Sequence, residues 1–251
     1  MAVKLIGFVL CSITMINVIT SRSLPSYFKP CKRDDPNLNE CLMKLMDSIR
    51  PHISKGIPEM HVLPLDPMMI PSVTLNQNSA GSVNFVALFT DLKGYGAKNF
   101  QINKIKANFK NQSFEIDLNL PLFRIESRYE VNGQILVLPI KGNGKFVGNF
   151  TNAHAKVKFE LRILEKKNHK NFIEIKKNKI NLELGAVKLH FSNLFNGNKE
   201  LGDQTNRFIN ENWTDLMQEI RPLIEDTVAA IVLGIFKPVL ETFSMDDLFP
   251  V

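Results

Sequence analysis

The sequence predicts an α+β fold, in which an antiparallel sheet curls around a long C-terminal helix and a short helix precedes the sheet. Three observations predict it. Apolar and polar residues alternate in runs between residues 73 and about 195, which indicates strands with one buried face. A long apolar stripe at helical spacing then runs from Ile209 to Ile235. A shorter helical stripe lies between about Asn39 and Ser54.

The N-terminus has the layout of a secretory signal peptide. Lys4 supplies a positive charge, an apolar run follows at residues 5–19, and small residues suited to cleavage come next. The run is shorter than the ~20 apolar residues that span a bilayer, which disfavours a membrane anchor. We therefore expect cleavage just before Leu24, which removes residues 1–23. Residues 24–251 are then a single secreted, extracellular domain.

Cleavage would leave two cysteines, Cys31 and Cys41, because Cys11 lies in the removed segment. Two cysteines in an oxidising compartment most simply form one disulfide, which closes a short loop. Closure of such a loop stabilises a fold by roughly 3 kcal/mol in the chain-entropy model. A metal pair is the alternative, but no third or fourth ligand has suitable spacing. We predict a disulfide and no metal site.

Three sequons for N-glycosylation agree with secretion, at Asn111, Asn149 and Asn212. Each is weak alone, because such triplets arise often by chance. Asn212 is the least convincing, since it precedes a tryptophan on a predicted helix. The formal net charge of +6 is mild, and the basic residues are spread along the chain. We therefore expect neither a nucleic-acid partner nor stable membrane insertion.

Proline and glycine mark the predicted connections between elements. Residues 24–38 form an irregular lead-in, and four prolines in residues 57–72 argue against a helix or a central strand there. Turns are predicted at residues 94–96, 132–133, 142–144 and 166–171. No helical pattern separates the alternating runs, so we expect short connections and a meander. The alternating runs begin at Phe114, Phe123, Ala155, Ile180 and Val187.

The C-terminal stripe predicts one continuous helix. Asp203 or Thr205 is the expected N-cap, Pro222 is expected to kink the helix, and Pro238 is expected to end or bend it. Residues 228–236 are apolar almost all round, which predicts a helix end surrounded by protein. That stretch is too short to cross a membrane.

No residue pattern indicates catalysis. The five histidines form no metal-ligand pair, and we expect them on the surface. The chain has no nucleophile elbow, phosphate loop or dinucleotide fingerprint. The glycines of residues 142–148 lead into a predicted strand, so no helix N-terminus is available there for a phosphate. The acidic pairs at residues 34–35 and 246–247 lie in predicted loops near the termini. We expect no enzymatic activity and no cofactor.

Motifs lie at both ends of the chain, at residues 28–41, 56–59, 64–67, 210–213, Pro222 and residues 248–250. Together they resemble the takeout/juvenile-hormone-binding family of insect secreted carriers. The resemblance covers essentially the whole mature chain. It implies a highly curved antiparallel sheet that wraps the long helix and encloses an apolar tunnel. It also implies transport of lipophilic molecules, linked to feeding, circadian and chemosensory behaviour. The haemolymph hormone carriers have a second disulfide, so a chain without cysteine after Cys41 looks more like the takeout branch.

The leading hypothesis is reversible binding of a small lipophilic molecule (hormone, lipid or semiochemical) between the helix stripe and the concave face of the sheet. Burial of ligand surface would drive binding at roughly 25 cal/mol per Å² before the costs of association. Such side chains are often plain core, so the alternative is a secreted signalling or interaction protein with a filled core that acts through its surface. The protein receptor is unknown. Candidate ligand contacts are Trp213, Leu216, Ile220 and Ile224 on the helix, and Phe114, Phe123 and Phe159 on strands.

Overall fold

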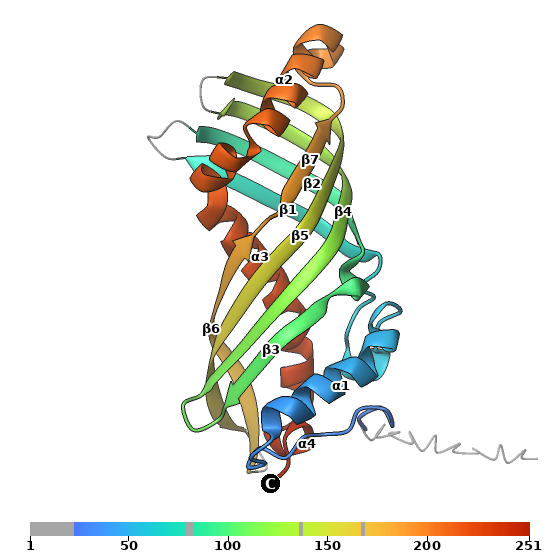
Figure 1. The fold of residues 1–251 in the computed structure, drawn as a ribbon, viewed down its shortest axis with the longest axis vertical. Coiled ribbons are helices and arrows are strands. Elements are labelled where there is room, and N and C mark those ends of the chain that lie inside the picture. The colour runs from blue at the N-terminus through green and yellow to red at the C-terminus, as the bar shows by residue number, and fades with distance from the viewer. Residues whose placement is uncertain (1–22, 79–82, 136–137, 167–168) are drawn as a thin grey trace, which may run out of the picture.

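The computed structural model describes residues 23–78, 83–135, 138–166 and 169–251. Residues 1–22 of the predicted signal peptide lie outside the described residues, so that prediction stays open. Figure 1 shows an elongated molecule, in which a curved sheet runs along most of the length and one long helix lies along its concave side. The elements are α1 (Leu38–Ile53), η1 (Pro58–Met60), β1 (Met68–Asn78), β2 (Val83–Tyr95), η2 (Ala97–Asn99), β3 (Gln101–Asn108), β4 (Ser113–Ile135), β5 (Leu138–Lys166), β6 (Lys170–Glu183), β7 (Ala186–Phe191), η3 (Phe195–Gly197), α2 (Lys199–Glu211), α3 (Trp213–Thr242) and α4 (Met245–Leu248).

Two very long strands form the centre of the sheet. β4 has 23 residues and β5 has 29, and they pair antiparallel over almost their whole length. The strand order is β1-β2-β4-β5-β6, with β3 also pairing with β4 and β7 also pairing with β5. β2 and β3 therefore cover successive parts of β4, and β6 and β7 cover successive parts of β5. This arrangement confirms the predicted curved antiparallel sheet.

An irregularity at the middle of the sheet changes which residues face inward. Leu120 pairs with Ala153 and Leu122 with Thr151, whereas Pro121 and Asn152 between them form no regular pair. Asn152 has a positive φ of 51°. Inward-facing positions of β4 are even-numbered before Pro121 and odd-numbered after it. The two alternating runs that begin at Phe114 and Phe123 are therefore one bent strand.

Two of the predicted turns are wrong, because their glycines lie inside strands. Residues 132–133 belong to β4 and residues 142–144 belong to β5. A side chain at Gly133 would meet the backbone of Asn84 and Phe85, and one at Gly144 would meet the carbonyl oxygen of Ser192. These glycines allow a neighbouring backbone to approach closely, which is the other common use of glycine within a strand.

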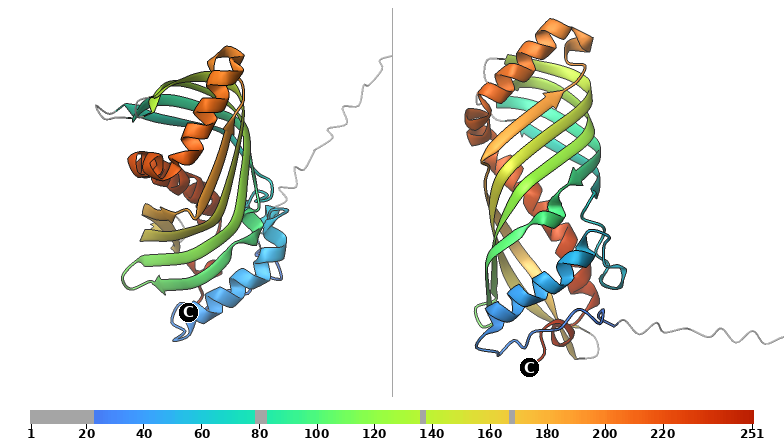
Figure 2. Two further views of the ribbon diagram at one scale, coloured as in Figure 1. Left: turned by 45° about the horizontal axis from the view of Figure 1, so that its top comes forward. Right: turned by 45° about the vertical axis from the view of Figure 1, so that its right-hand side comes forward.

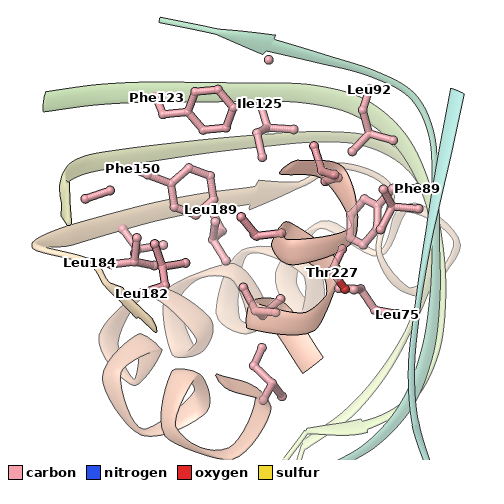
Figure 3. A pocket seen from close by; sticks show the side chains of 18 of the residues that line it. Leu75, Phe89, Leu92, Phe123, Ile125, Phe150, Leu182, Leu184, Leu189 and Thr227 are labelled. Carbon is pink, nitrogen blue, oxygen red and sulfur yellow. The ribbon is translucent and has the colours of Figure 1, made fainter. Parts of the chain in front are cut away.

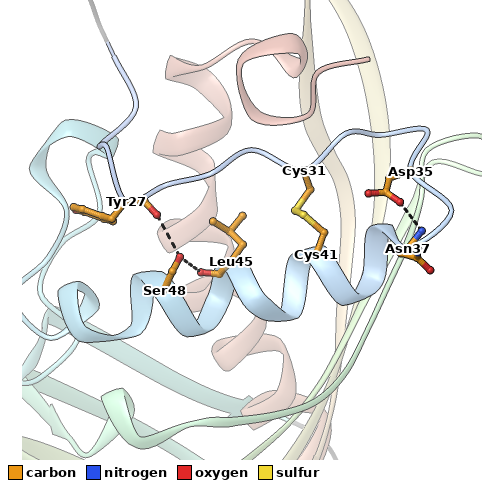
Figure 4. Close-up of a disulfide and its surroundings, with 7 residues drawn as sticks. All are labelled: Tyr27, Cys31, Asp35, Asn37, Cys41, Leu45 and Ser48. Carbon is orange, nitrogen blue, oxygen red and sulfur yellow. Dashed lines mark hydrogen bonds between the residues drawn. A yellow bond between two sulfur atoms is a disulfide. The ribbon is translucent and has the colours of Figure 1, made fainter.

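The N-terminal helix follows its prediction closely. α1 packs against β3, and Cys31 and Cys41 form the predicted disulfide with Cα atoms 5.9 Å apart. Figure 4 shows the lead-in running alongside α1, where the hydroxyl of Ser48 donates to the carbonyl oxygens of Leu45 and Tyr27. The proline-rich stretch differs from its prediction at one end. β1 begins at Met68 and contains Pro71, which an edge strand tolerates because its outer N–H groups need no strand partner.

The C-terminal stripe is divided between two helices instead of one. α2 ends at Glu211 and α3 begins at Trp213, with Asn212 between them. The N-cap of α2 is Asn198, whose side chain accepts a hydrogen bond from the Leu201 backbone N–H, so the predicted caps Asp203 and Thr205 are wrong. α3 continues through both of its prolines to Thr242, so Pro238 does not end the helix.

Hydrogen bonds hold α3 to the edge strand β6. The Arg221 guanidinium donates to the Leu182 carbonyl oxygen (2.6 Å), and the Glu225 carboxylate accepts from the Leu182 N–H (2.9 Å). Further along, the Asn178 amide donates to the Ala229 carbonyl oxygen (2.6 Å). The side chains of the helix thus satisfy backbone groups that an edge strand would otherwise leave unpaired. Figure 2 shows α3 lying across the open side of the curved sheet.

Removing the Glu225 carboxylate is expected to weaken this attachment. Glu225→Ala leaves the Leu182 N–H without its acceptor, which should lower the free energy of unfolding by about 1–3 kcal/mol. Glu241→Ala is the matched control, because Glu241 is 61% exposed and pairs only with Lys237 on the same helix. The control should change the free energy by less than about 0.5 kcal/mol. Urea unfolding compares the two, and equal effects would contradict the proposed role of Glu225.

A capping box closes the C-terminal end. The hydroxyl of Ser244, which is 2% exposed, donates to the Asp247 carboxylate (2.6 Å), and the Ser244 N–H donates to the same oxygen (2.8 Å). Burial by itself raises the pKa of Asp247, but the hydrogen bonds from Ser244 and the charge of Lys170 outweigh it and hold the pKa below its usual value. The ionised carboxylate therefore stabilises the folded state.

The lowered pKa of Asp247 predicts a pH-dependent effect of Asp247→Asn. Its stabilising contribution is fully present above the unfolded pKa of about 3.9 and is lost as the pH falls through the lower folded pKa. The variant should lose about 1 kcal/mol of unfolding free energy at neutral pH and progressively less as the pH falls below about 3.9. Denaturant titrations at neutral pH and at a pH below about 3.9 measure the loss of unfolding free energy in the variant. Asp226→Asn is the control. A loss that is independent of pH would contradict it.

Candidate ligand cavity

An apolar cavity of about 520 Å³ lies between the concave face of the sheet and α3. Figure 3 shows its walls, with Phe123 and Ile125 of β4 and Phe150 of β5 on one side and the turns of α3 on another. Six strands contribute to the wall (β1, β2, β4, β5, β6 and β7), and Leu65 and Phe100 add to it from the connecting segments. The cavity therefore depends on contacts between segments far apart in the sequence.

Among the described residues, no charged side chain lines the cavity. Its polar groups are the Thr227 hydroxyl and the Trp213 indole N–H, and all other lining side chains are hydrocarbon or thioether. Thr227 already donates its hydroxyl hydrogen to the Leu223 carbonyl oxygen (2.7 Å), so it can offer a ligand only its lone pairs. Burying an unpaired charge in such surroundings is costly. The cavity is therefore suited to an uncharged, predominantly apolar guest.

Small residues in the wall help to keep this space open. Ala153 and Ala155 occupy consecutive inward positions of β5, and Ala87 and Gly94 lie on β2. The Phe123 ring lies over Gly94, where an added Cβ would approach its Cζ to 2.8 Å. The same ring is 6.5 Å from the ring of Phe150. The wall thus alternates bulky rings with positions that have almost no side chain.

Five of the seven predicted contact residues line the cavity: Trp213, Leu216, Ile220 and Ile224 of the helix and Phe123 of β4. That they contact a ligand stays a prediction. Phe114 and Phe159 are not among the lining residues, and that they contact a ligand likewise stays a prediction. They belong to a packed cluster with Ile116, Val157 and the end of α3. Their inward-facing positions were predicted correctly, but the space they face is filled.

The sequence reasoning missed several aromatic lining residues. Phe89, Phe146, Phe150 and Phe191 all line the cavity. Phe146 and Phe150 flank Gly148 at alternate positions of β5, which is a strand pattern. Residues 142–144 were predicted to form a turn, so the alternation that continues through Phe146 was not recognised. Following the inward face across Asn152 would have identified both rings.

Two buried hydroxyls lie on the inward face of β4 beside the cavity. The Tyr129 hydroxyl donates to the Ser192 carbonyl oxygen (2.7 Å), and burial raises the pKa of Tyr129 to about 12. Tyr129 therefore stays neutral at physiological pH. Ser127 is 9% exposed, and its hydroxyl oxygen has no hydrogen-bond partner among the described residues. Among the described residues, neither hydroxyl forms a hydrogen bond with a side-chain base of the kind that activates a nucleophile.

Within the described residues, histidine, cysteine and acidic side chains form no group of three or more that could hold a metal ion. None of the helices in the described part of the chain is long and apolar enough to span a membrane. The apolar cavity is therefore the candidate functional site.

The chain is similar to proteins from several insects. The circadian clock-controlled protein daywake of Drosophila melanogaster is 26% identical over 253 residues, which cover 98% of this chain and 94% of daywake. A putative beta-carotene-binding protein of Schistocerca gregaria is 18% identical over 217 residues, covering 86% of this chain and 85% of that protein. The crystal structure of Epiphyas postvittana Takeout 1 matches with a TM-score of 0.74 and 22% identity, covering 88% of this chain and 99% of that one. This last likeness shows a common fold.

The family model described as haemolymph juvenile hormone binding protein (JHBP) matches residues 7–250, which is nearly the whole sequence. Its match agrees with the resemblance carried by the motifs at the two ends of the chain. The chain therefore belongs to the haemolymph juvenile hormone binding protein family.

Proposed function

We propose that the chain is a secreted carrier that reversibly binds a small lipophilic molecule in the cavity between α3 and the sheet. The observation that carries the proposal is the cavity of about 520 Å³ whose lining has no charge. Small-molecule sites in proteins commonly enclose ~300–1,000 Å³ and are lined mainly by apolar side chains. The protein would act by binding, without chemical change to its cargo.

The chemistry of the lining restricts the class of cargo. Burial of the cargo's apolar surface would supply the free energy of binding, at roughly 25 cal/mol per Å² before the costs of association. Thr227 and Trp213 are the lining residues with a polar side-chain atom among those described, so at most one or two polar atoms of the cargo would be satisfied. Hormone-like esters, long-chain alcohols and polyenes meet these requirements. The printed name of the Schistocerca gregaria relative, a putative carotene-binding protein, agrees with this class.

The alternative is a signalling or interaction protein that has a filled core and acts through its surface. A filled core would place bulky side chains opposite the helix stripe. Here Ala153, Ala155 and Gly94 occupy wall positions, and the space beside them is empty of protein atoms. The cavity therefore favours the carrier hypothesis over this alternative.

Trp213 offers a direct test, because it is the single tryptophan of the chain and it lines the cavity. Bromododecane, whose bromine quenches indole fluorescence at short range, should quench Trp213 saturably at one molecule per chain. Ala155→Phe places a ring into the cavity and should abolish this quenching while the thermal midpoint is kept. Lys156→Phe is the matched control, since the next residue of the strand points to the opposite face.

Two results would contradict the carrier proposal. The first is an absence of saturable quenching in the unmodified protein after extraction with a mild apolar solvent. The second is equal quenching in Ala155→Phe and Lys156→Phe, which would mean that the quencher reaches Trp213 from outside. Loss of binding in Ala155→Phe alone supports the proposed location.

Secretion is part of the same proposal. The Cys31–Cys41 disulfide is the kind of cross-link that persists in oxidising compartments. The predicted signal peptide at residues 1–23 and the membership in a family described from haemolymph support the same compartment. The relative daywake is described as controlled by the circadian clock, which suggests a link of this chain to daily rhythms.

The three sequons differ in their suitability for glycosylation. Asn111 is exposed in the turn between β3 and β4. Asn149 is partly buried on β5, where its side-chain oxygen accepts from Arg124 (3.1 Å). Asn212 lies between α2 and α3, and its amide nitrogen, the atom that would carry a glycan, donates to the Phe208 carbonyl oxygen (2.8 Å).

We predict a glycan at Asn111 and none at Asn212 in the secreted protein. Glycosylated asparagine is a surface feature, and the Asn212 amide is engaged by the preceding helix. Peptide mapping by mass spectrometry before and after glycosidase treatment measures both sites. Asn111→Gln should increase the electrophoretic mobility and Asn212→Gln should leave it unchanged. A glycan found on Asn212 would contradict the prediction.

A further inference from the structure

We propose that four side chains form a floor of the cavity and set the maximum length of the cargo. The cavity floor consists of Phe114 of β4, Phe159 of β5, Asn178 of β6 and Phe236 of α3. This inference rests on the proposed function, because it concerns the cargo bound in the same cavity. It assigns a role to Phe114 and Phe159, which face inward without lining the cavity.

At this end of the cavity the lining stops within two adjacent rows of the sheet. The last lining residues are Leu118 on β4, Val157 on β5, Ile180 on β6 and Ile235 on α3. Val157 pairs directly with Ile180 and with Ile116 across the sheet. Ile116 itself is not among the lining residues, so on β4 the lining ends one row earlier, at Leu118, which pairs with Ala155.

On β5 and β6 the cavity floor is the next inward-facing row, and on β4 the buried Ile116 lies between the last lining residue and Phe114. Phe159 pairs with Phe114 on one side and with Asn178 on the other. The rings of Phe114 and Phe159 lie 6.4 Å apart. Phe236 closes the row from the helix side, with its ring 5.5 Å from that of Phe159 at an interplanar angle of 70°. This edge-to-face geometry is a favourable arrangement of aromatic rings.

Asn178 ties the cavity floor to the helix. Its amide donates to the Ala229 carbonyl oxygen at 2.6 Å, so β6 and α3 are held together at this level. Beyond the floor the interior is packed, with Leu161, Ile173 and Met245 buried in one cluster. The rings of Phe109 and Phe249 meet at 4.8 Å in the same region. The interior is thus hollow on one side of the floor and filled on the other.

This arrangement predicts that affinity rises with cargo length only up to a certain length. We call this length the break, because longer cargo gains no further affinity. Each methylene buried in the cavity should tighten binding by about fourfold. The gain ends when the chain tip reaches the rings of Phe159 and Phe236, because a longer chain must displace packed side chains or leave its other end in water. The length at the break is a property of the floor residues.

The test uses a homologous series of straight-chain primary alcohols that displace the fluorophore phenylnaphthylamine from the full secreted protein. Phe236→Ala opens the floor, so the break should move to longer chains. An alcohol two carbons beyond the wild-type break should then bind about 15-fold more tightly to the variant than to wild type. Phe159→Leu should move the break in the same direction. Val157→Phe, one row above the floor, should move it to shorter chains.

Phe109→Ala is the matched control, because it makes the same change in the filled region beyond the floor. It should lower the thermal midpoint as a core truncation does and leave the break where it is. If Phe236→Ala does not fold, the other two variants decide the outcome. Phe159→Leu should move the break to longer chains, and Val157→Phe should move it to shorter chains. An unchanged break in folded floor variants would overturn this inference. Failure of wild type to bind any alcohol of the series would instead count against the proposed function.

Discussion

The attachment of α3 across the open side of the sheet is the constraint on which the interior depends. A strongly bent sheet has a concave apolar face that must be covered, and α3 is the element that covers it. Arg221, Glu225 and Asn178 hold this helix to β6 through hydrogen bonds with backbone groups at both ends of the contact. Because these bonds fix the helix against one edge, its apolar stripe faces the concave side without closing onto it. The empty space follows from the small residues on the wall opposite.

Much of this architecture could be predicted from the sequence, because it depends on local periodicity. Alternating apolar and polar residues predicted the sheet, and the helical stripe predicted the long helix that covers it. The two cysteines predicted the disulfide. The errors arose where tertiary contacts override local signals. Gly133 and Gly144 were predicted to be turn residues, but they lie in strands and allow a neighbouring backbone to approach closely. At Pro121 and Asn152 the inward face changes parity, which no single run of residues reveals.

Whether an apolar face meets empty space or another side chain could not be predicted from the pattern. Phe123 of β4 and Phe159 of β5 both face inward, yet the first lines the cavity and the second is packed against Phe236. The difference depends on the register of β4, β5 and β6 and on the position of α3, which are set by the whole fold. Relatives at 18–26% identity carry names as different as a clock-controlled protein and a carotene-binding protein. In the proposed carrier, the shared fold would leave the choice of cargo to the residues of the wall and the proposed floor.

The central claim is that the secreted protein carries a guest inside an apolar cavity. Native mass spectrometry of protein secreted from cultured insect cells, before and after extraction with an apolar solvent, tests it most directly. We expect a discrete added mass at one molecule per chain, lost on extraction, absent from Ala155→Phe and identifiable as an uncharged lipophilic compound. A protein that shows only its own mass, both under mild conditions and after incubation with an insect lipid extract, would contradict the claim.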